Sequence, residues 1–247
     1  MQNAKAKTIT ITSVKGGTGK TTTVLNIAGL LSTRKLRTII VDLDLHSGVI
    51  APSLNVQVEN DFYDLTSDIA NNRFNQIEDY ITKYNDYIDL LAAPKDPRMA
   101  YKIDPKYINV VLSRLSFKYD VILIDTNHII DGVNLITYDN SDQIIYLLSN
   151  DLMDFRNMKN MITIYEDMEK SNYKIVLNES LNQDEFSKFD IKTILNHSID
   201  YTLPKSFHLR NLQKYVQNGE LATLDKANAK EKGIEVPEIK KTRGDII

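Results

Sequence analysis

The sequence has no cysteine and no tryptophan, and its 247 residues include only 6 prolines and 9 glycines. The absence of cysteine excludes disulfide bonds, thiolate metal sites and cysteine nucleophiles, and it fits a reducing compartment. Charge of one sign is not in large excess either, because 30 lysines and arginines face 33 aspartates and glutamates, a formal net charge of −3. Nucleic-acid binders usually carry a basic excess, so we expect no nucleic-acid partner beyond a local patch.

Long hydrophobic runs are also missing. No apolar stretch approaches the roughly 18 to 20 residues that a membrane-spanning helix needs. The first apolar run, Thr8–Val14, leads directly into a glycine loop, which is unlike a signal peptide. With 42% hydrophobic and 26% charged residues, the chain has the composition of a folded globular protein. We therefore expect a cytoplasmic protein that is at most peripheral to a membrane.

Short apolar runs rich in β-branched residues recur along the chain and predict buried strands. Segments of helical length and period lie between most of them, and this alternation predicts an α/β fold with a doubly wound, mostly parallel sheet. The predicted strands are Thr8–Val14, Thr38–Leu43, Ile88–Ala92, Asp120–Ile124, Gln143–Leu148, Tyr173–Leu177 and Ser198–Leu203. The predicted helices include Lys20–Ser32, Pro105–Phe117, Leu152–Lys170 and Ser206–Asn218.

No internal repeat, low-complexity linker or break in composition divides the chain. We therefore predict a single domain over residues 1–224, followed by a C-terminal tail of mixed charge over residues 225–247. Apolar positions in the tail are too sparse for an amphipathic membrane helix.

Polar segments follow the predicted strands. In open α/β sheets, ligands bind outside the carboxyl ends of the strands, so these segments are predicted to converge on one functional edge. They are Lys15–Thr22, Asp42–Gly48, Asp125–His128, Ser149–Asp151, Asn178 and Pro204.

The segment KGGTGKTT, between the first predicted strand and the first predicted helix, has the context of a phosphate-binding loop. Its glycines allow backbone N–H groups to turn toward phosphate oxygens, and the helix N-terminus adds partial positive charge. Lys20 is predicted to neutralise the β- and γ-phosphates, and the Thr21 hydroxyl to bind Mg²⁺. Val14 stands where the general pattern has a further glycine. The predicted nucleotide-binding residues of this loop are Gly16, Gly17, Thr18, Gly19, Lys20, Thr21 and Thr22.

Three carboxylates follow predicted strands. Asp42 and Asp44 lie two residues apart at the end of one strand, and Asp125 closes the apolar run YDVILID. A carboxylate at a buried edge is costly unless it meets a metal or an ordered water, so a nucleotide and Mg²⁺ explain these residues better than packing does. His128 has two open interpretations: it faces the γ-phosphate region, or it is an ordinary loop histidine.

An additional lysine, Lys15, stands just before the glycine pair of KGGTGKTT and gives the loop a further resemblance. The loop resembles the deviant Walker A motif of the MinD/ParA ATPases, which are P-loop NTPases. The resemblance implies an ATP-dependent homodimer in which Lys15 reaches the nucleotide of the partner subunit. It also implies slow, Mg²⁺-dependent hydrolysis of ATP to ADP and phosphate, used as a switch.

The same resemblance implies roles for residues outside the loop. Asp44 is expected to position the attacking water, and Asp42 and Asp125 are expected to hold Mg²⁺ from its outer shell. Asn178, at the end of KIVLN, matches the asparagine that reads the adenine edge. Pro204, at the end of YTLP, matches a proline loop that packs on the base.

Over residues 8–224 the chain is similar to the ATPase domain of CpaE/TadZ proteins, through segments such as VDLDLHSGVI, LLAAPKDPRMA and SNDLMDFRNMKNM. This resemblance implies a protein that positions a Tad/Flp-type pilus or secretion machine. Its partner would be that machinery or a polar landmark protein, at the inner face of the membrane or the cell pole. A ParA-type partition ATPase and a non-hydrolysing, ATP-binding scaffold are the alternatives. A metabolic enzyme of this superfold would need a cysteine pair or a substrate domain, and the sequence has neither.

The predicted helix Leu152–Lys170 carries an apolar stripe. We interpret this stripe as the face that packs on the sheet, the alternative being an adaptable surface for a partner. Its residues are Phe155, Met158, Met161, Ile162, Tyr165 and Met168.

Overall fold

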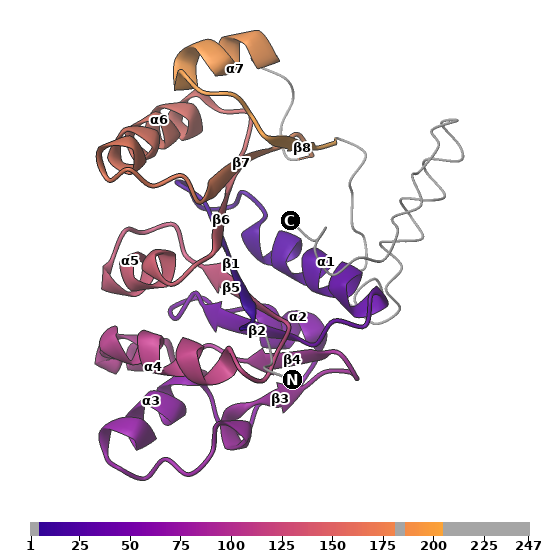
Figure 1. Ribbon diagram of the computed structural model, residues 1–247, viewed down its shortest axis with the longest axis vertical. Helices are drawn as coiled ribbons and strands as arrows, with labels where there is room; N and C mark the ends of the chain where they lie inside the picture. The colour runs from indigo at the N-terminus through magenta and orange to yellow at the C-terminus, as the bar shows by residue number, and fades with distance from the viewer. Residues whose placement is uncertain (1–4, 181–185, 205–247) are drawn as a thin grey trace.

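The computed structural model describes residues 5–180 and 186–204. They form one eight-stranded sheet in the order β3-β4-β2-β5-β1-β6-β7-β8 (Figure 1). All neighbouring strands are parallel except β3, which runs antiparallel to β4. The predicted doubly wound, mostly parallel sheet is therefore confirmed. The strands are β1 Lys7–Thr12, β2 Thr38–Leu43, β3 Thr82–Lys83, β4 Ile88–Leu91, β5 Val121–Thr126, β6 Gln143–Leu148, β7 Tyr173–Asn178 and β8 Tyr201–Leu203.

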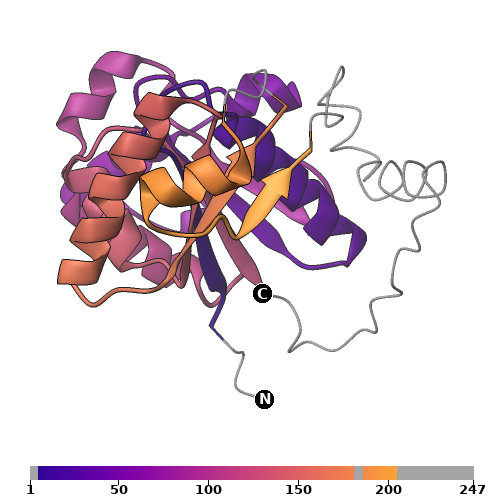
Figure 2. The same cartoon turned by 90° about the horizontal axis from the view of Figure 1, so that it is seen from above.

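Helices cover both faces of the sheet. Figure 1 shows α1 and α2 on one face and α3, α4, α5 and α6 on the other, and the view from above in Figure 2 separates the same two layers. The helices are α1 Lys20–Thr33, α2 Ile50–Leu54, α3 Phe62–Ala70, α4 Lys106–Leu115, α5 Gly132–Asp139, α6 Leu152–Asp167 and α7 Lys188–Leu195, with 3-10 helices η1 Ile77–Tyr80 and η2 Pro97–Lys102.

Side-chain caps begin several of these helices. Asp61 and Asp64 form a capping box at the start of α3, and Ser187 and Asp190 form another at the start of α7. Asp151 caps α6 by accepting hydrogen bonds from the backbone N–H groups of Met153 and Asp154. Such caps satisfy N–H groups that have no partner inside the helix, so each start is set locally by sequence.

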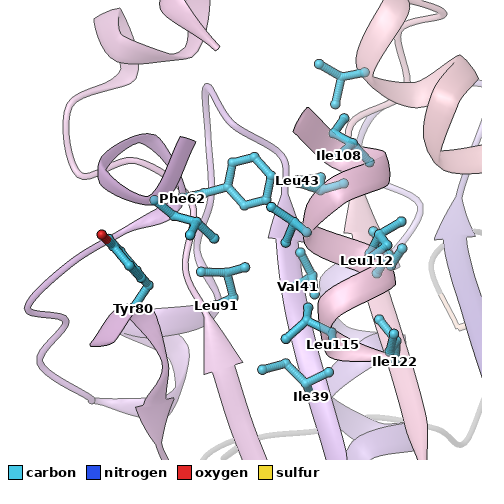
Figure 3. Close-up of a cluster of buried hydrophobic side chains, with 14 of the residues drawn as sticks. Ile39, Val41, Leu43, Phe62, Tyr80, Leu91, Ile108, Leu112, Leu115 and Ile122 are labelled. Atoms are coloured by element: carbon cyan, nitrogen blue, oxygen red, sulfur yellow. The ribbon is translucent and has the colours of Figure 1, made fainter. Parts of the chain in front are cut away.

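The core lies on both faces of the central strands. Every residue of β2 and β5 is buried, as expected for strands covered on both faces. On one face, Val41 and Ile122 pack against Phe62 of α3 and Leu112 of α4 (Figure 3). On the other face, Ile40 and Leu123 belong to the cluster that includes α1. The two layers hold the carboxyl ends of the strands in fixed relative positions.

Some predicted boundaries were wrong. β1 ends at Thr12, so Ser13 and Val14 belong to the glycine loop instead of the strand. β8 begins only at Tyr201, and α6 ends at Asp167. The helices α2, α3, α5 and α7 and the short strand β3 were not predicted. The predicted helix 206–218, the domain limit at residue 224 and the tail 225–247 lie outside the described residues.

The apolar stripe of α6 packs into the core, as the preferred interpretation predicted. Phe155, Met158, Met161, Ile162 and Tyr165 are all buried there. Met168 is the exception: it follows the last residue of α6 and is 53% exposed.

The part of the chain that the structure describes contains no helix both long and apolar enough to span a membrane.

Candidate functional site

The predicted site residues follow neighbouring strands at one edge of the sheet. The glycine loop follows β1, and β1 lies between β5 and β6. The aspartates of β2 and β5 lie on one side of this loop, and the polar residues after β6 and β7 lie on the other. This arrangement surrounds the loop with side chains from four other strands.

The loop has the backbone conformation that its glycines predict. Gly17 and Gly19 have φ angles of 78° and 92°, a left-handed region that side chains other than glycine rarely adopt. α1 begins directly after Gly19, so the free N–H groups of its first turn face the loop. The Thr18 hydroxyl is buried and has no hydrogen-bond partner among the described residues. This geometry suits an anion such as a phosphate group.

Asn178, the last residue of β7, forms a hydrogen bond to the loop. Its amide Nδ2 donates a hydrogen bond of 3.0 Å to the backbone oxygen of Thr18, and its Oδ1 accepts from Ser180. A Cβ atom at Gly19 would lie 3.0 Å from the same amide, so glycine permits this close approach. Thus the structure places Asn178 against the phosphate loop, whereas Pro204 lies exposed after the edge strand β8.

Lys20, the first residue of α1, is largely buried, and its ammonium group donates to the Ser13 hydroxyl at 3.2 Å. Burial lowers the pKa of Lys20, while the charges of Asp125, Asp44 and Asp154 oppose that shift. An ammonium group has three N–H donors, so this hydrogen bond leaves capacity for phosphate oxygens.

Asp42 and Asp125 form a pair of buried carboxylates. They are register partners on the adjacent strands β2 and β5, and each is 1% exposed. Burial raises the pKa of Asp125 to about 7, and burial together with the charge of Asp125 raises the pKa of Asp42 well above its ordinary value. A nearby divalent cation would remove the cost of holding two such carboxylates together.

The residues around Asp125 fit a magnesium ion. The Thr21 hydroxyl donates to Asp125 Oδ2 at 2.5 Å, while Asp125 Oδ1 is buried without a hydrogen-bond partner in the described part of the chain. Residues 5–180 and 186–204 contain no group of three or more His, Asp or Glu side chains that could hold a metal by themselves. The hydroxyl of Thr21 and the free oxygen of Asp125 suit Mg²⁺, which takes oxygen ligands from a few side chains and the rest from water and phosphate.

Asp44 lies just beyond β2 and is half-buried, nearer to solvent than Asp42. Its backbone N–H donates to Asp42 Oδ1 at 3.2 Å, which fixes the chain direction after the strand. The Asp44 carboxylate acts on Lys20 and Asp125, so it borders the same charged cluster.

Gly48 was not predicted as a site residue, and it lies against Asp42. A Cβ atom at position 48 would lie 2.8 Å from Asp42 Oδ2 and would overlap the side chain of Ala93. Glycine therefore lets the loop close over Asp42, and two residues later the Ile50 N–H donates to the same Oδ2 at 3.3 Å. The signal in the sequence was a glycine shortly after the Asp-x-Asp segment.

Two exposed residues border the loop. The ammonium group of Lys15 lies 3.4 Å from Asp151 Oδ2 at the start of α6, a partner that the sequence analysis did not predict. The His128 ring lies beside Gly16, because a Cβ atom there would be 3.6 Å from its Cε1. Both side chains are thus on the open side of the site, and His128 adjoins the phosphate loop.

The sequence profile of the CobQ/CobB/MinD/ParA nucleotide-binding domain matches residues 9–214. The chain belongs to this family. The match contains the glycine loop KGGTGKTT, so this loop lies within a nucleotide-binding domain of the MinD/ParA family.

Curated relatives of this MinD/ParA-type chain cover it in part. It is 31% identical over 113 residues to an uncharacterized ATP-binding protein of Methanocaldococcus jannaschii, a match spanning 46% of this chain and 41% of that protein. It is 28% identical over 130 residues to a ParA family protein of Chlamydia trachomatis, with 49% of each chain covered. The chain thus spans about half the length of these relatives or less.

Solved structures extend the likeness of fold over most of the chain. A ParA family ATPase from Chlorobium tepidum superposes with a TM-score of 0.75 at 19% identity, covering 88% of this chain and 92% of the other. MinD from Pyrococcus horikoshii, solved with Mg-ADP, superposes with a TM-score of 0.68 at 20% identity, covering 88% and 86%. These likenesses establish the fold, and the CpaE/TadZ-like placement stays a prediction.

Proposed function

We propose that this protein binds Mg-ATP at the loop Lys15–Thr22, forms a homodimer around the nucleotides, and hydrolyses ATP slowly as a switch. The paired carboxylates Asp42 and Asp125 beside Thr21 carry this proposal, because their buried charge needs a cation. MinD of Pyrococcus horikoshii, which shares the fold, was solved with Mg-ADP.

In this proposal, some residues bind the nucleotide and Mg²⁺, and others position the attacking water and the base. The loop N–H groups and Lys20 bind the phosphates, while Thr21, Asp42 and Asp125 hold Mg²⁺, which offsets charge on the phosphates when bound. Asp44 orients a water molecule for attack, and Asn178 and Pro204 contact the base. Phosphoryl transfer depends mainly on such positioning and charge compensation, with little covalent chemistry by the protein.

Lys15 should separate nucleotide binding from dimerisation. Its ammonium group forms an ion pair with Asp151, outside the loop, and in the proposed dimer it serves the partner's nucleotide. Replacing Lys15 with alanine should therefore leave the ATP affinity within about threefold of wild type, since an exposed charge contributes little locally. ATP-dependent dimerisation should be lost, as measured by light scattering with and without ATP.

Lys159→Ala is the matched control. It removes an exposed lysine from α6, the helix that Asp151 caps, and it should dimerise normally. A Lys15→Ala protein that dimerises like wild type would remove the basis for the trans role.

We further propose that the output of the switch is the placement of a Tad/Flp-type pilus or secretion machine. The protein would act in the cytoplasm, recruited by that machinery or by a polar landmark to the inner face of the membrane or a cell pole. The similarity of VDLDLHSGVI and LLAAPKDPRMA to CpaE/TadZ proteins supports this proposal. The alternative, DNA partition, is favoured by the similarity in fold to ParA proteins.

DNA binding discriminates between these two outputs. Nonspecific binding requires several lysines or arginines that meet phosphates together, and it weakens steeply with salt. In the described part of the chain, Arg37, Lys83 and Lys118 line one pocket, but Glu78, Asp86 and Asp89 line it as well. Arg37 and Lys118 are also paired with carboxylates, as is Lys174 on β7. We therefore expect no ATP-dependent retention of the protein on random duplex DNA at about 150 mM salt.

The retention experiment compares wild type with a variant lacking Lys205 and Arg210, which lie outside the described residues. Tight, salt-sensitive retention that this variant loses would replace the pilus proposal with partition.

A further inference from the structure

Asp154 is a fully buried carboxylate in the first turn of α6, with 0% of its surface exposed. Its Oδ2 accepts hydrogen bonds from the Ser149 backbone N–H at 2.9 Å and from the Ser149 hydroxyl. Its Oδ1 is buried and has no hydrogen-bond partner among the described residues. A buried carboxylate with one oxygen unpartnered is costly unless a cation lies nearby.

The buried Asp154 carboxylate lies on the same side of the sheet end as the phosphate-loop lysine, Lys20. Ser149 follows β6, and Ser13, the hydrogen-bond partner of Lys20, follows the adjacent strand β1. Asp154 and Lys20 therefore lie behind the same end of the sheet, and the charge of Asp154 acts on the ammonium group of Lys20. Asp154 is thus one of three carboxylates, after Asp125 and Asp44, whose charge acts on the lysine of the phosphate loop.

The three carboxylates that act on Lys20 differ in their position. Asp125 and Asp44 are on or just after β5 and β2, on the side of the loop where Asp42 and Thr21 also lie. Asp154 is on the β6 side, separated from them by β1. A magnesium ion held by Thr21, Asp42 and Asp125 would lie beside the first group, whereas Asp154 lies on the other side of β1.

We propose that Asp154 restrains nucleotide affinity: it competes with the phosphates for Lys20 and repels them from behind the loop. This inference rests on the proposed nucleotide site. For a switch, the consequence is faster release of ADP, because the buried carboxylate attracts the ammonium group of Lys20 and repels the phosphates. Asp154 is a positioning residue in this scheme, since its carboxylate contacts Ser149 and acts on Lys20 through its charge, without touching the nucleotide.

Asp154→Asn tests the proposal with little change of shape. The asparagine Oδ1 can accept both hydrogen bonds from Ser149, and its amide replaces an oxygen that has no donor to lose. Without the charge, Mg-ADP and Mg-ATP should bind about tenfold more tightly, the size expected for one charge about 12 Å from the phosphates at an effective dielectric constant near 20. Dissociation of a fluorescent ADP analogue should slow by a similar factor.

The control is Asp190→Asn at the start of α7. There the Ser187 N–H and hydroxyl donate to Asp190 Oδ2 at 3.0 and 2.6 Å, the same pair of donors that Asp154 has, but the side chain is exposed. Calorimetry on the full chain should show an unchanged affinity for this variant.

The sign of the change decides the outcome, because damage to packing weakens binding whereas loss of the competing charge strengthens it. Affinity in Asp154→Asn that is equal to or weaker than wild type would overturn the proposal. Thermal unfolding without nucleotide reports whether the variant folds, and Asp154→Ser, which also removes the charge, replaces it if it does not. A wild-type protein that binds neither nucleotide would instead overturn the proposed function itself.

Discussion

Lys20→Ala is expected to weaken the binding of Mg-ATP by on the order of 100-fold, the upper range for a hydrogen bond to a charged group. The physical reason is its position: Lys20 is the largely buried ammonium group at the start of α1, and it has donors free for the β- and γ-phosphates. The glycine conformations at 17 and 19 do not depend on it, so the loss is of charge and not of loop shape. Calorimetry with Mg²⁺ measures the affinity.

Lys83→Ala is the control for this experiment, since Lys83 is an exposed lysine on β3 at the far edge of the sheet. Removing Lys20 also leaves Asp125 and Asp154 without their cation, so the thermal unfolding temperature is recorded for each variant. Lys20→Met keeps the length of the side chain if the alanine variant does not fold. Unchanged ATP affinity in a folded variant would contradict the assignment of the loop.

Asp44→Ala should act on turnover and leave binding intact. The half-buried Asp44 carboxylate borders the charged cluster, and the hydrogen bond that its residue makes to Asp42 comes from the backbone, which alanine retains. Loss of water positioning should lower the hydrolysis rate by about 100-fold or more, in the range of general acid–base and positioning effects. Phosphate release measures the rate, and light scattering should show that the ATP-bound dimer persists.

Asp86→Ala removes an aspartate at the opposite edge of the sheet, near β3 and β4, and should leave the rate unchanged. Normal turnover by a monomeric Asp44→Ala protein would refute both the role of Asp44 and the site.

The sequence predicted the central sheet because the strands that decide the fold are buried on both faces. Fully buried strands such as β2 and β5 appear as continuous β-branched runs that can be recognised without tertiary information. α1 was found for a similar reason, since it follows directly from a glycine loop of fixed spacing. The short helices α2, α3, α5 and α7 were missed because few turns of helix carry little periodic signal.

For the site, the sequence by itself predicted the phosphate loop and the aspartates at the carboxyl ends of β2 and β5, because each lies at the end of a recognisable strand. Tertiary structure alone decided which charges share an environment: that Asp42 and Asp125 are register partners, that Asp151 meets Lys15, and that Asp154 acts on Lys20. These pairings depend on strand order and on burial, which join residues distant in sequence and make their charges interact strongly. Local sequence specifies neither strand order nor burial, so the position of Asp154 behind the phosphate loop could be recognised only in the folded chain.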